Sequence, residues 1–164
     1  MYENKVDSDT SEFLQTGLGM KNEWHVVTEF ENKIAEFFGA PYAVATDCCT
    51  NALELSIRLE KMKKGREVRP ITVPFHTYVS VPNMLIKNNW TFNWGDVRWH
   101  GYHYLTKETI DAAVYWKRNG YEPGTKMCLS FFYRKHLSTD RGGMILLDNK
   151  EDAEPPPNPI NMAG

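Results

Sequence analysis

The sequence predicts an α/β protein with three layers, α/β/α, around a mostly parallel sheet. Three observations lead to this prediction: apolar and amphipathic segments alternate as strand, helix, strand, helix, strand; the apolar segments are short enough for buried strands; and polar turns follow them. Ligands of such sheets bind at the carboxyl ends of the strands. The turns at residues 46–51 and 74–78 are therefore the first places to look for a site.

The composition fits one globular domain with a substantial core. The chain has 164 residues, of which 41% are hydrophobic and 13% aromatic, with a net charge of −2. It shows no charge block and no long apolar run, so we expect no nucleic-acid partner and no membrane partner. The polar N-terminus is unlike a signal peptide. Three cysteines without Cys-x-x-Cys spacing favour reduced thiols in the cytoplasm over a disulfide framework or zinc site.

The first half of the predicted domain follows a polar arm or short helix over residues 1–24. Apolar residues at helical spacing predict a helix over 28–38, ended by Gly39. Residues 42–46 are small and apolar, which suits a buried strand. A second amphipathic helix begins at Ala52 and ends before Gly65.

The second half continues the alternation. Residues 70–74 predict a buried strand, Pro82 lies near the start of a helix, and residues 90–97 alternate as a strand does. We expect His100 and His103 to lie in a surface loop. We predict a core domain over residues 1–152, followed by a Pro-rich tail over 153–164 that is extended or disordered.

The turn Asp47-Cys-Cys-Thr-Asn51 joins a predicted strand directly to a helix. Free backbone N–H groups at such a place can bind a phosphate. The simpler interpretation is an ordinary helix start, capped by the Thr50 hydroxyl.

Lys135 follows a short apolar run and precedes a polar turn and the pair Gly142-Gly143. Its side chain either reaches water along an apolar surface, or is an amine that burial and the neighbouring Arg134 make free to form a Schiff base. Asp111 lies among small apolar residues, and a buried carboxylate needs a cation or a hydrogen-bond donor.

Four segments carry motifs in a fixed order. They are Phe30 to Gly39; Cys49-Thr50-Asn51-Ala52-Leu53; Pro74-Phe-His-Thr-Tyr78-Val-Ser80; and Ser130-Phe131 through Lys135 with Gly142-Gly143-Met144. Together they span most of residues 24–152 and resemble the DegT/DnrJ/EryC1/StrS family of pyridoxal-phosphate aminotransferases, which act on keto sugars attached to nucleotides. The last segment is the most specific, because its Ser-to-Lys and Lys-to-Gly spacings are the family's.

The resemblance implies a reduced fold-type I transferase domain that binds pyridoxal 5′-phosphate. Lys135 would form the Schiff base with the cofactor and shuttle the substrate proton. Asp111 would keep the pyridine nitrogen protonated, and Tyr78 would stack on the ring. Thr50 and Ser130 would bind the phosphate with their hydroxyls, beside the backbone N–H of Asn51.

The chain also departs from the family pattern. Only residues 97–110 lie between the strand ending at Asp96 and Asp111, where the family has a longer strand-helix-strand passage. Val114 occupies a position where Gln or His is frequent, and His136 one where Asn is common. The family's C-terminal small domain has no counterpart here, which is consistent with either a truncated form or a compact, virus-encoded homologue.

The resemblance implies an aminotransferase that moves an amino group from an amino acid, glutamate in the first instance, to a keto sugar of a nucleotide-sugar. Such reactions serve surface-polysaccharide or deoxysugar biosynthesis. The alternative is a non-catalytic binding or scaffold domain that kept the fold. A metal site built from His76, His100 and His103 is a third, weaker alternative. Because the family's site lies at a dimer interface, we expect a cytoplasmic homodimer.

Overall fold

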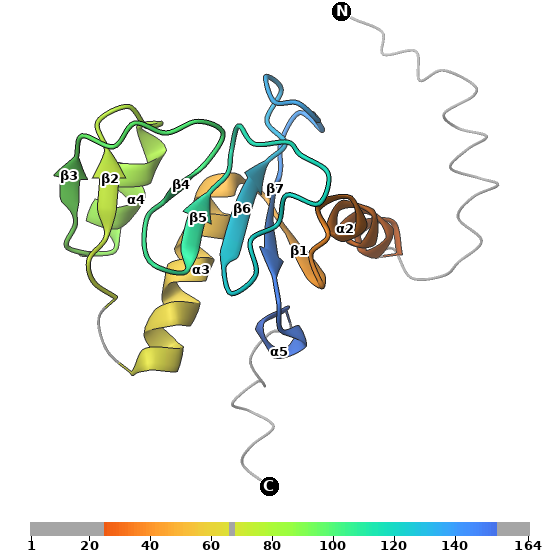
Figure 1. Ribbon diagram of the computed structural model, residues 1–164, viewed down its shortest axis with the longest axis horizontal. Helices are drawn as coiled ribbons and strands as arrows, with labels where there is room; N and C mark the ends of the chain where they lie inside the picture. Colours follow the sequence, from red (N-terminus) through yellow and green to blue (C-terminus); the bar gives the residue numbers. More distant parts are fainter. Residues whose placement is uncertain (1–24, 66–67, 154–164) are drawn as a thin grey trace, which may run out of the picture.

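The secondary structure follows the predicted alternation. The structure is a computed structural model, described here over residues 25–65 and 68–153. Its elements are α2 (His25–Phe38), β1 (Tyr42–Thr46), α3 (Cys49–Lys64), β2 (Thr72–Pro74), α4 (Ser80–Lys87), β3 (Asn93–Gly95), β4 (His103–Tyr104), β5 (Thr109–Asp111), β6 (Lys126–Ser130), β7 (Gly143–Leu147) and α5 (Lys150–Ala153). Figure 1 shows their arrangement around a central sheet.

The central sheet has five strands in the order β1-β7-β6-β5-β4, and β2 and β3 form a second, parallel pair. The α/β class is confirmed, but the central sheet is mixed rather than mostly parallel. Strands β5 and β6 are parallel, whereas β1–β7, β6–β7 and β4–β5 are antiparallel pairs. Strands β1, β5 and β6 therefore share one direction, and β4 and β7 run the other way.

The reversed direction of β7 has a local cause. Residues 131–142, which join β6 to β7, contain no helix among the described elements. A parallel return to the sheet needs a crossover that is usually helical, whereas an antiparallel return does not. The chain thus turns back beside β6, with Ser130 opposite Gly143. The sequence motif that contains Lys135 is the turn of this hairpin.

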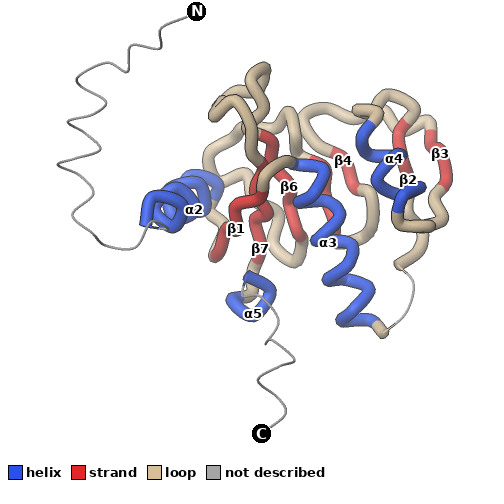
Figure 2. The backbone as a smooth tube through the Cα atoms, turned by 180° about the vertical axis from the view of Figure 1, so that it is seen from behind, coloured by secondary structure: helices blue, strands red, loops and turns tan. Residues whose placement is uncertain are grey.

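Side chains alternate between the two faces of the sheet and divide the core into two parts. On one face, Met127 and Leu129 of β6 join a cluster with Ile34 and Phe38 of α2. On the other face, Cys128 of the same strand packs in a cluster with residues of α3 and α4. Helix α3 accordingly lies in front of the sheet in Figure 2 and behind it in Figure 1. The predicted three layers are confirmed.

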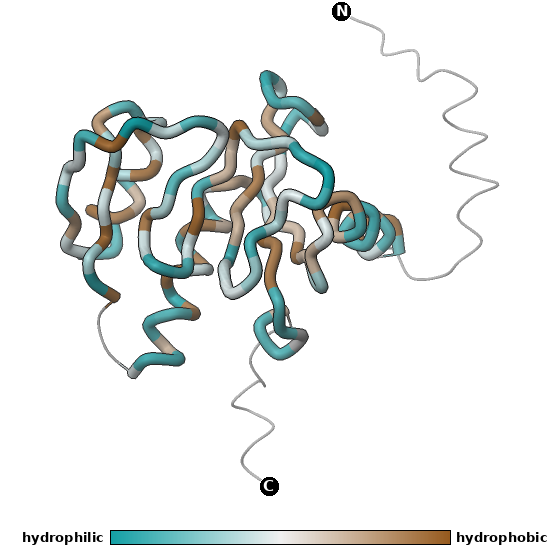
Figure 3. The backbone as a smooth tube through the Cα atoms, viewed as in Figure 1, coloured by the Kyte–Doolittle hydropathy of each residue, from teal (hydrophilic) through white to brown (hydrophobic). Residues whose placement is uncertain are grey.

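Figure 3 shows hydrophobic colours along β5 and β7 and hydrophilic colours on α5 and many of the surrounding loops. The three strands β5, β6 and β7 are buried along almost their whole length. Strands buried on both faces read as continuous apolar runs, which explains why β6 and β7 stood out in the sequence.

The helix ends agree with the predicted stop signals. Gly39 and Gly65 adopt the left-handed conformation, with φ of 72° and 59°, directly after α2 and α3. The Gly65 N–H donates to the carbonyl of Met62 and closes the last turn of α3. The start of α3 differs from the prediction, because the helix begins at Cys49 and takes up most of the polar turn.

The short passage between β3 and β5 contains one short strand, β4, which is antiparallel to β5. Strand β4 pairs with β5, and the carbonyl of Leu105 accepts a 2.9 Å hydrogen bond from the Thr72 N–H. This bond links the start of β2 to the edge of the central sheet. The prediction of a surface loop is right for His100, which is exposed, and wrong for His103, which is buried in β4 with its ring packed against Trp99.

The predicted N-terminal arm and almost all of the predicted tail lie outside the described residues. Ala153, the first residue of that tail, is the last residue of α5. None of the described helices is long and apolar enough to cross a membrane.

Candidate functional site

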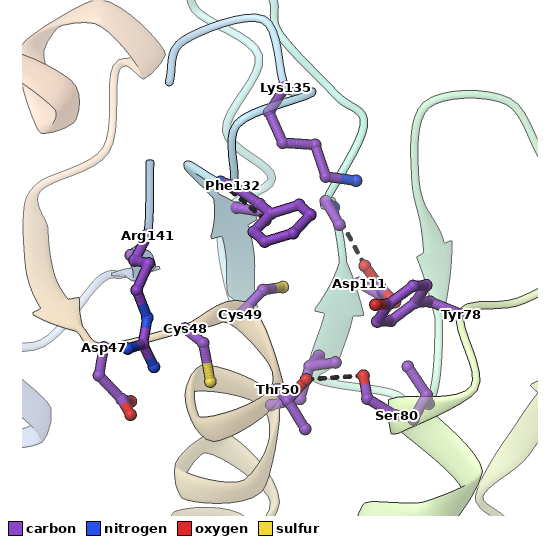
Figure 4. A pocket seen from close by; sticks show the side chains of 15 residues that line it. Asp47, Cys48, Cys49, Thr50, Tyr78, Ser80, Asp111, Phe132, Lys135 and Arg141 are labelled. Carbon is purple, nitrogen blue, oxygen red and sulfur yellow. Dashed lines mark hydrogen bonds between the residues drawn. The ribbon is translucent and has the colours of Figure 1, made fainter. Parts of the chain in front are cut away.

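A pocket of about 250 Å³ opens where β5 and β6 end and α3 begins. It is lined by five of the six predicted site residues: Thr50, Tyr78, Asp111, Ser130 and Lys135. These residues come from four separate segments of the chain, and Figure 4 labels four of them, Thr50, Tyr78, Asp111 and Lys135, around one space. The pocket lies at the carboxyl ends of two parallel strands, where the sequence predicted a site.

The first turn of α3 forms the floor of this pocket. Cys48 precedes the helix in an extended conformation and makes no side-chain capping bond. The first turn therefore keeps backbone N–H groups for which the helix itself has no acceptor. The Thr50 hydroxyl lies 2.7 Å from the Ser80 hydroxyl rather than capping the helix start. The interpretation of Thr50 as an ordinary N-cap is therefore wrong.

Gly143 allows the sheet to approach the start of α3. A side-chain carbon at this position would overlap the backbone atoms of Cys48 and Cys49. Gly143 pairs with Thr46 of β1 and with Ser130 of β6, so it lies between the two strands that lead into the pocket. The second glycine of the sequence motif is thus required by close backbone packing.

Asp111 ends β5 with its side chain in the pocket. It is only 7% exposed, and its Oδ1 accepts a 3.0 Å hydrogen bond from the Ala113 N–H. Burial raises the pKa of Asp111, and nearby His103, the Ala113 N–H and Lys135 oppose that rise. The buried carboxylate expected from the sequence is present, and it has one backbone donor.

Lys135 lies in the turn between β6 and β7. Its backbone N–H donates to the carbonyl of Phe132 over 2.8 Å, and its side chain extends into the pocket (Figure 4). Arg134 does not line the pocket, and its guanidinium lies 4.9 Å from the centre of the Tyr133 ring. Burial also raises the pKa of the Cys49 thiol beside the pocket, which makes Cys49 a poor nucleophile.

Two predicted residues lie near the rim. Tyr78 is 71% exposed, and its ring stands beside Asp111 in Figure 4. Asn51 does not line the pocket with the others; its side-chain amide donates to Asp47 over 2.7 Å. Its expected contribution was the backbone N–H in the first turn of α3, which this side-chain bond leaves free.

Several residues that line the pocket were not predicted as site residues from the sequence, among them Ser80, Phe132 and Arg141. Ser80 could have been found, because it closes the third motif. Phe132 and Arg141 flank Lys135 and Gly142, but nothing in the local pattern indicates which way their side chains point.

Comparison with known proteins agrees with this geometry. The profile of the DegT/DnrJ/EryC1/StrS aminotransferase family matches residues 3–120. The chain belongs to this family. The match ends before Lys135, so the last motif is supported by the hairpin geometry rather than by the profile.

Solved structures of similar fold point the same way. They include a GDP-4-keto-6-deoxymannose-3-dehydratase, ColD (TM-score 0.65, 19% identity, 87% of this chain and 48% of that one). Another is PseC of Helicobacter pylori, an aminotransferase involved in the biosynthesis of pseudoaminic acid (TM-score 0.64, 13% identity, 90% of this chain and 51% of that one). A third is an aminotransferase from Psychrobacter cryohalolentis (0.62, 16%, 93% and 49%). The chain spans about half the length of these structures, and no curated protein matches it.

The family's cofactor is pyridoxal phosphate, as the sequence predicted. The donor set in the pocket fits this molecule: hydroxyls and a helix start for a phosphate, a buried carboxylate for a pyridine nitrogen, and an amine for an aldehyde. Within the described part of the chain, no group of three His, Cys, Asp or Glu side chains could hold a metal ion.

Proposed function

We propose that this protein is a pyridoxal-phosphate-dependent transferase that moves an amino group from an amino acid to a keto sugar carried by a nucleotide. One observation carries the proposal. Thr50, Tyr78, Asp111, Ser130 and Lys135 are separated by up to 85 positions in the sequence, yet they line one pocket. A cofactor with a phosphate, an aromatic ring and an aldehyde accounts for all five at once.

Each side chain has a separate task in this proposal. Thr50, Ser130 and the first-turn N–H groups of α3, including that of Asn51, hold the phosphate. Ser80 joins them, since its hydroxyl already lies 2.7 Å from that of Thr50. Tyr78 covers one face of the ring, and the Asp111 carboxylate binds the pyridine nitrogen.

Lys135 would hold the cofactor through its aldehyde, with release of water, and its amine would carry the proton that moves during amino transfer. The bound cofactor supplies an electron sink for a carbanion next to the substrate nitrogen. The Asp111 anion favours the protonated pyridine on which that sink depends. Phe132 and Tyr78 line the same pocket as Lys135.

The acceptor in this proposal is a nucleotide-bound keto sugar, and the donor is an amino acid such as glutamate. Structures of similar fold include a GDP-4-keto-6-deoxymannose-3-dehydratase and the same kind of enzyme with a trapped PLP-glutamate geminal diamine. Nucleotide-bound keto sugars and glutamate are therefore the substrate classes to test first, in surface-polysaccharide or deoxysugar synthesis. The proposal assigns the protein to the cytoplasm, where its three free cysteines stay reduced.

The proposal includes a homodimer. Large apolar side chains are exposed beside the pocket: Phe75 stacks on Trp94 with ring centres 6.1 Å apart, and Tyr78 and Val79 are also exposed. A second copy that covered this surface would also close the open side of the pocket. Sedimentation equilibrium tests this part, and a monomer at all concentrations would contradict it.

The alternative function is a binding or scaffold domain that keeps the fold without catalysis. Half-transamination separates the two functions. A protein that converts its bound cofactor to the amine form with glutamate is catalytic, and one that binds the cofactor without this change is not.

The deciding experiment is an absorbance spectrum of the purified protein with added pyridoxal phosphate. We expect a band from the lysine-linked cofactor, and after borohydride reduction mass spectrometry should locate the pyridoxyl group on Lys135. Lys135→Ala should lose both signals. Lys117→Ala, an exposed lysine outside the pocket, should keep them. A wild-type protein that stays colourless with added cofactor would refute the proposal.

A further inference from the structure

His103 is buried without a hydrogen bond. Its ring is 4% exposed, and neither Nδ1 nor Nε2 has a partner in the described residues. An unpaired buried donor or acceptor destabilises the fold, so native proteins rarely keep one without a reason. Here a single side chain carries two such atoms.

The position of His103 indicates what it serves. In the antiparallel pair β4–β5, His103 stands directly opposite Asp111. Side chains of directly opposite residues lie on the same face of a sheet, close enough to interact. The imidazole is thus next to the carboxylate that ends β5 in the pocket.

Trp99 supports the imidazole from the side. The centre of its ring lies 4.9 Å from that of His103, at an interplanar angle of 42°. The indole is itself held, because its Nε1–H donates to the carbonyl of His76 over 3.0 Å. This packing limits the imidazole to small rotations and shields it from water.

The two buried groups act on each other electrostatically. Burial lowers the pKa of His103, and the charge of Asp111 opposes that change. Burial raises the pKa of Asp111, and His103 is the first influence that opposes it. Lys135 in the turn also opposes the rise in the pKa of Asp111. Burial, and then the charge of Asp111, raise the pKa of the Cys49 thiol on α3; burial is also the largest cause of the raised pKa of the Cys128 thiol on β6, to which Asp111 contributes.

We propose that His103 is a positioning residue for Asp111. A small rotation of the imidazole lets one ring N–H donate to the carboxylate, which otherwise has only the Ala113 N–H. The bond keeps Asp111 ionised and fixes its direction, so that its anion faces the pyridine nitrogen of the cofactor. The inference rests on the proposed function for that last step alone; the His103–Asp111 pair is a property of the chain by itself.

The pair is tested first without cofactor. Titration of the full chain by carboxyl ¹³C NMR should show a higher pKa for Asp111 in His103→Asn than in the wild type, because the opposing charge is gone. Conversely, Asp111→Asn should lower the pKa of His103 and change the ¹⁵N shifts of its ring. His100→Asn, an exposed histidine three positions away, should change neither.

Cofactor binding provides the second measurement. The dissociation constant of pyridoxal phosphate should rise about tenfold in His103→Asn, within the usual range of coupling between neighbouring groups. The pH at which the absorbance band changes should also move, which a purely structural role would not cause. His103→Gln, whose longer side chain can bring an amide donor to the position of the ring Nε2–H, should recover part of the affinity.

Each outcome has one meaning. Independent titration of His103 and Asp111 in the cofactor-free chain would overturn the inference, whatever the cofactor does. Coupled titration in a chain that never takes up cofactor would support the pair and refute the proposed function instead. If His103→Asn does not fold, the Asp111→Asn effect on the His103 ring still decides the matter.

Discussion

Two buried carboxylates lie at opposite ends of the same sheet and have opposite surroundings. Glu60 of α3 is fully buried and accepts 2.5 Å hydrogen bonds from the hydroxyls of Thr106 and Thr109. The Lys64 ammonium lies 3.3 Å from its other oxygen. Asp111, at the other end of β5, has one backbone N–H and an unbonded imidazole beside it.

The difference separates a charge whose partners the fold supplies from one that we propose to bind a ligand. At the Glu60 end, side chains of the protein itself supply the partners of the buried carboxylate. Glu108 adds ion pairs with Lys64 and Lys126 to this cluster. These ammonium groups lower the pKa of Glu108, with Lys64 the largest cause, despite partial burial. The Asp111 end leaves donors and acceptors open in a pocket, as expected where a ligand completes the set.

The most severe test of this comparison is Glu60→Ala. It leaves two buried hydroxyls and an ammonium without their acceptor, so we expect the free energy of unfolding to fall by about 4 kcal/mol. Urea unfolding measures the loss. Glu54→Ala on the same helix, which breaks a more exposed pair with Arg58, should cost about 1 kcal/mol or less. Equal losses in both variants would show that the Glu60 cluster is not a structural anchor.

Gly143→Ala tests the pocket end by crowding it. The added carbon must push against the backbone of Cys48 and Cys49, so we expect a loss of about 3 kcal/mol in unfolding free energy and a weaker phosphate site. Gly124→Ala is the control, since it meets open space and suffers only from its φ of 81°. That strain costs about 1 kcal/mol. A larger loss in the control would argue against close packing as the role of Gly143.

Of these substitutions, Asp111→Asn should change the unfolding free energy least. It should raise that free energy, whereas Glu60→Ala and Gly143→Ala should lower it. Removing a poorly partnered buried charge raises the unfolding free energy of the cofactor-free chain, by about 1 kcal/mol or less. The same variant should bind pyridoxal phosphate more weakly, because the partner of the pyridine nitrogen is lost. Chemical unfolding and cofactor titration measure the two effects, and a marked loss of stability would contradict the comparison with Glu60.

The pH dependence of Asp111→Asn follows from the raised pKa of Asp111. An acid with a higher pKa in the folded chain binds its proton more tightly when folded, so its ionisation destabilises the fold. The stability of the wild type relative to the variant should therefore decrease as pH rises above about 4, the unfolded value. The decrease should stop once the folded group is ionised. A difference that grows with pH would mean that Asp111 is stabilised as an anion.

Local patterns were enough to predict most of the elements. Helical spacing and the glycine stops located α2 and α3, and short apolar runs located β1 and β2. Strand direction was beyond reach, because the connection through Lys135 reads equally well as a crossover or a hairpin. Which strands become neighbours depends on contacts between distant segments, such as β1 with β7.

The pocket was predicted better than its surroundings. Thr50, Asp111 and Lys135 belong to motifs that lie close in sequence to the end of a strand or the start of a helix. These residues could therefore be identified from the sequence. His103 and Glu60 depend on pairing across the sheet and on packing against α3, and the polar sequence around His103 indicated a loop. Burial that tertiary contacts impose leaves little trace in the local sequence.

Helix α3 connects the two ends compared above. Its last turn carries Lys61, Lys63 and Lys64, and its first turn carries no acidic residue. Cations therefore compensate the negative end of the helix macrodipole, while the first turn at the positive end holds no acidic residue and lies at the pocket. A bound phosphate would complete the charge balance along the whole helix. Binding at one end of the molecule should thus strengthen a helix that is anchored at the other.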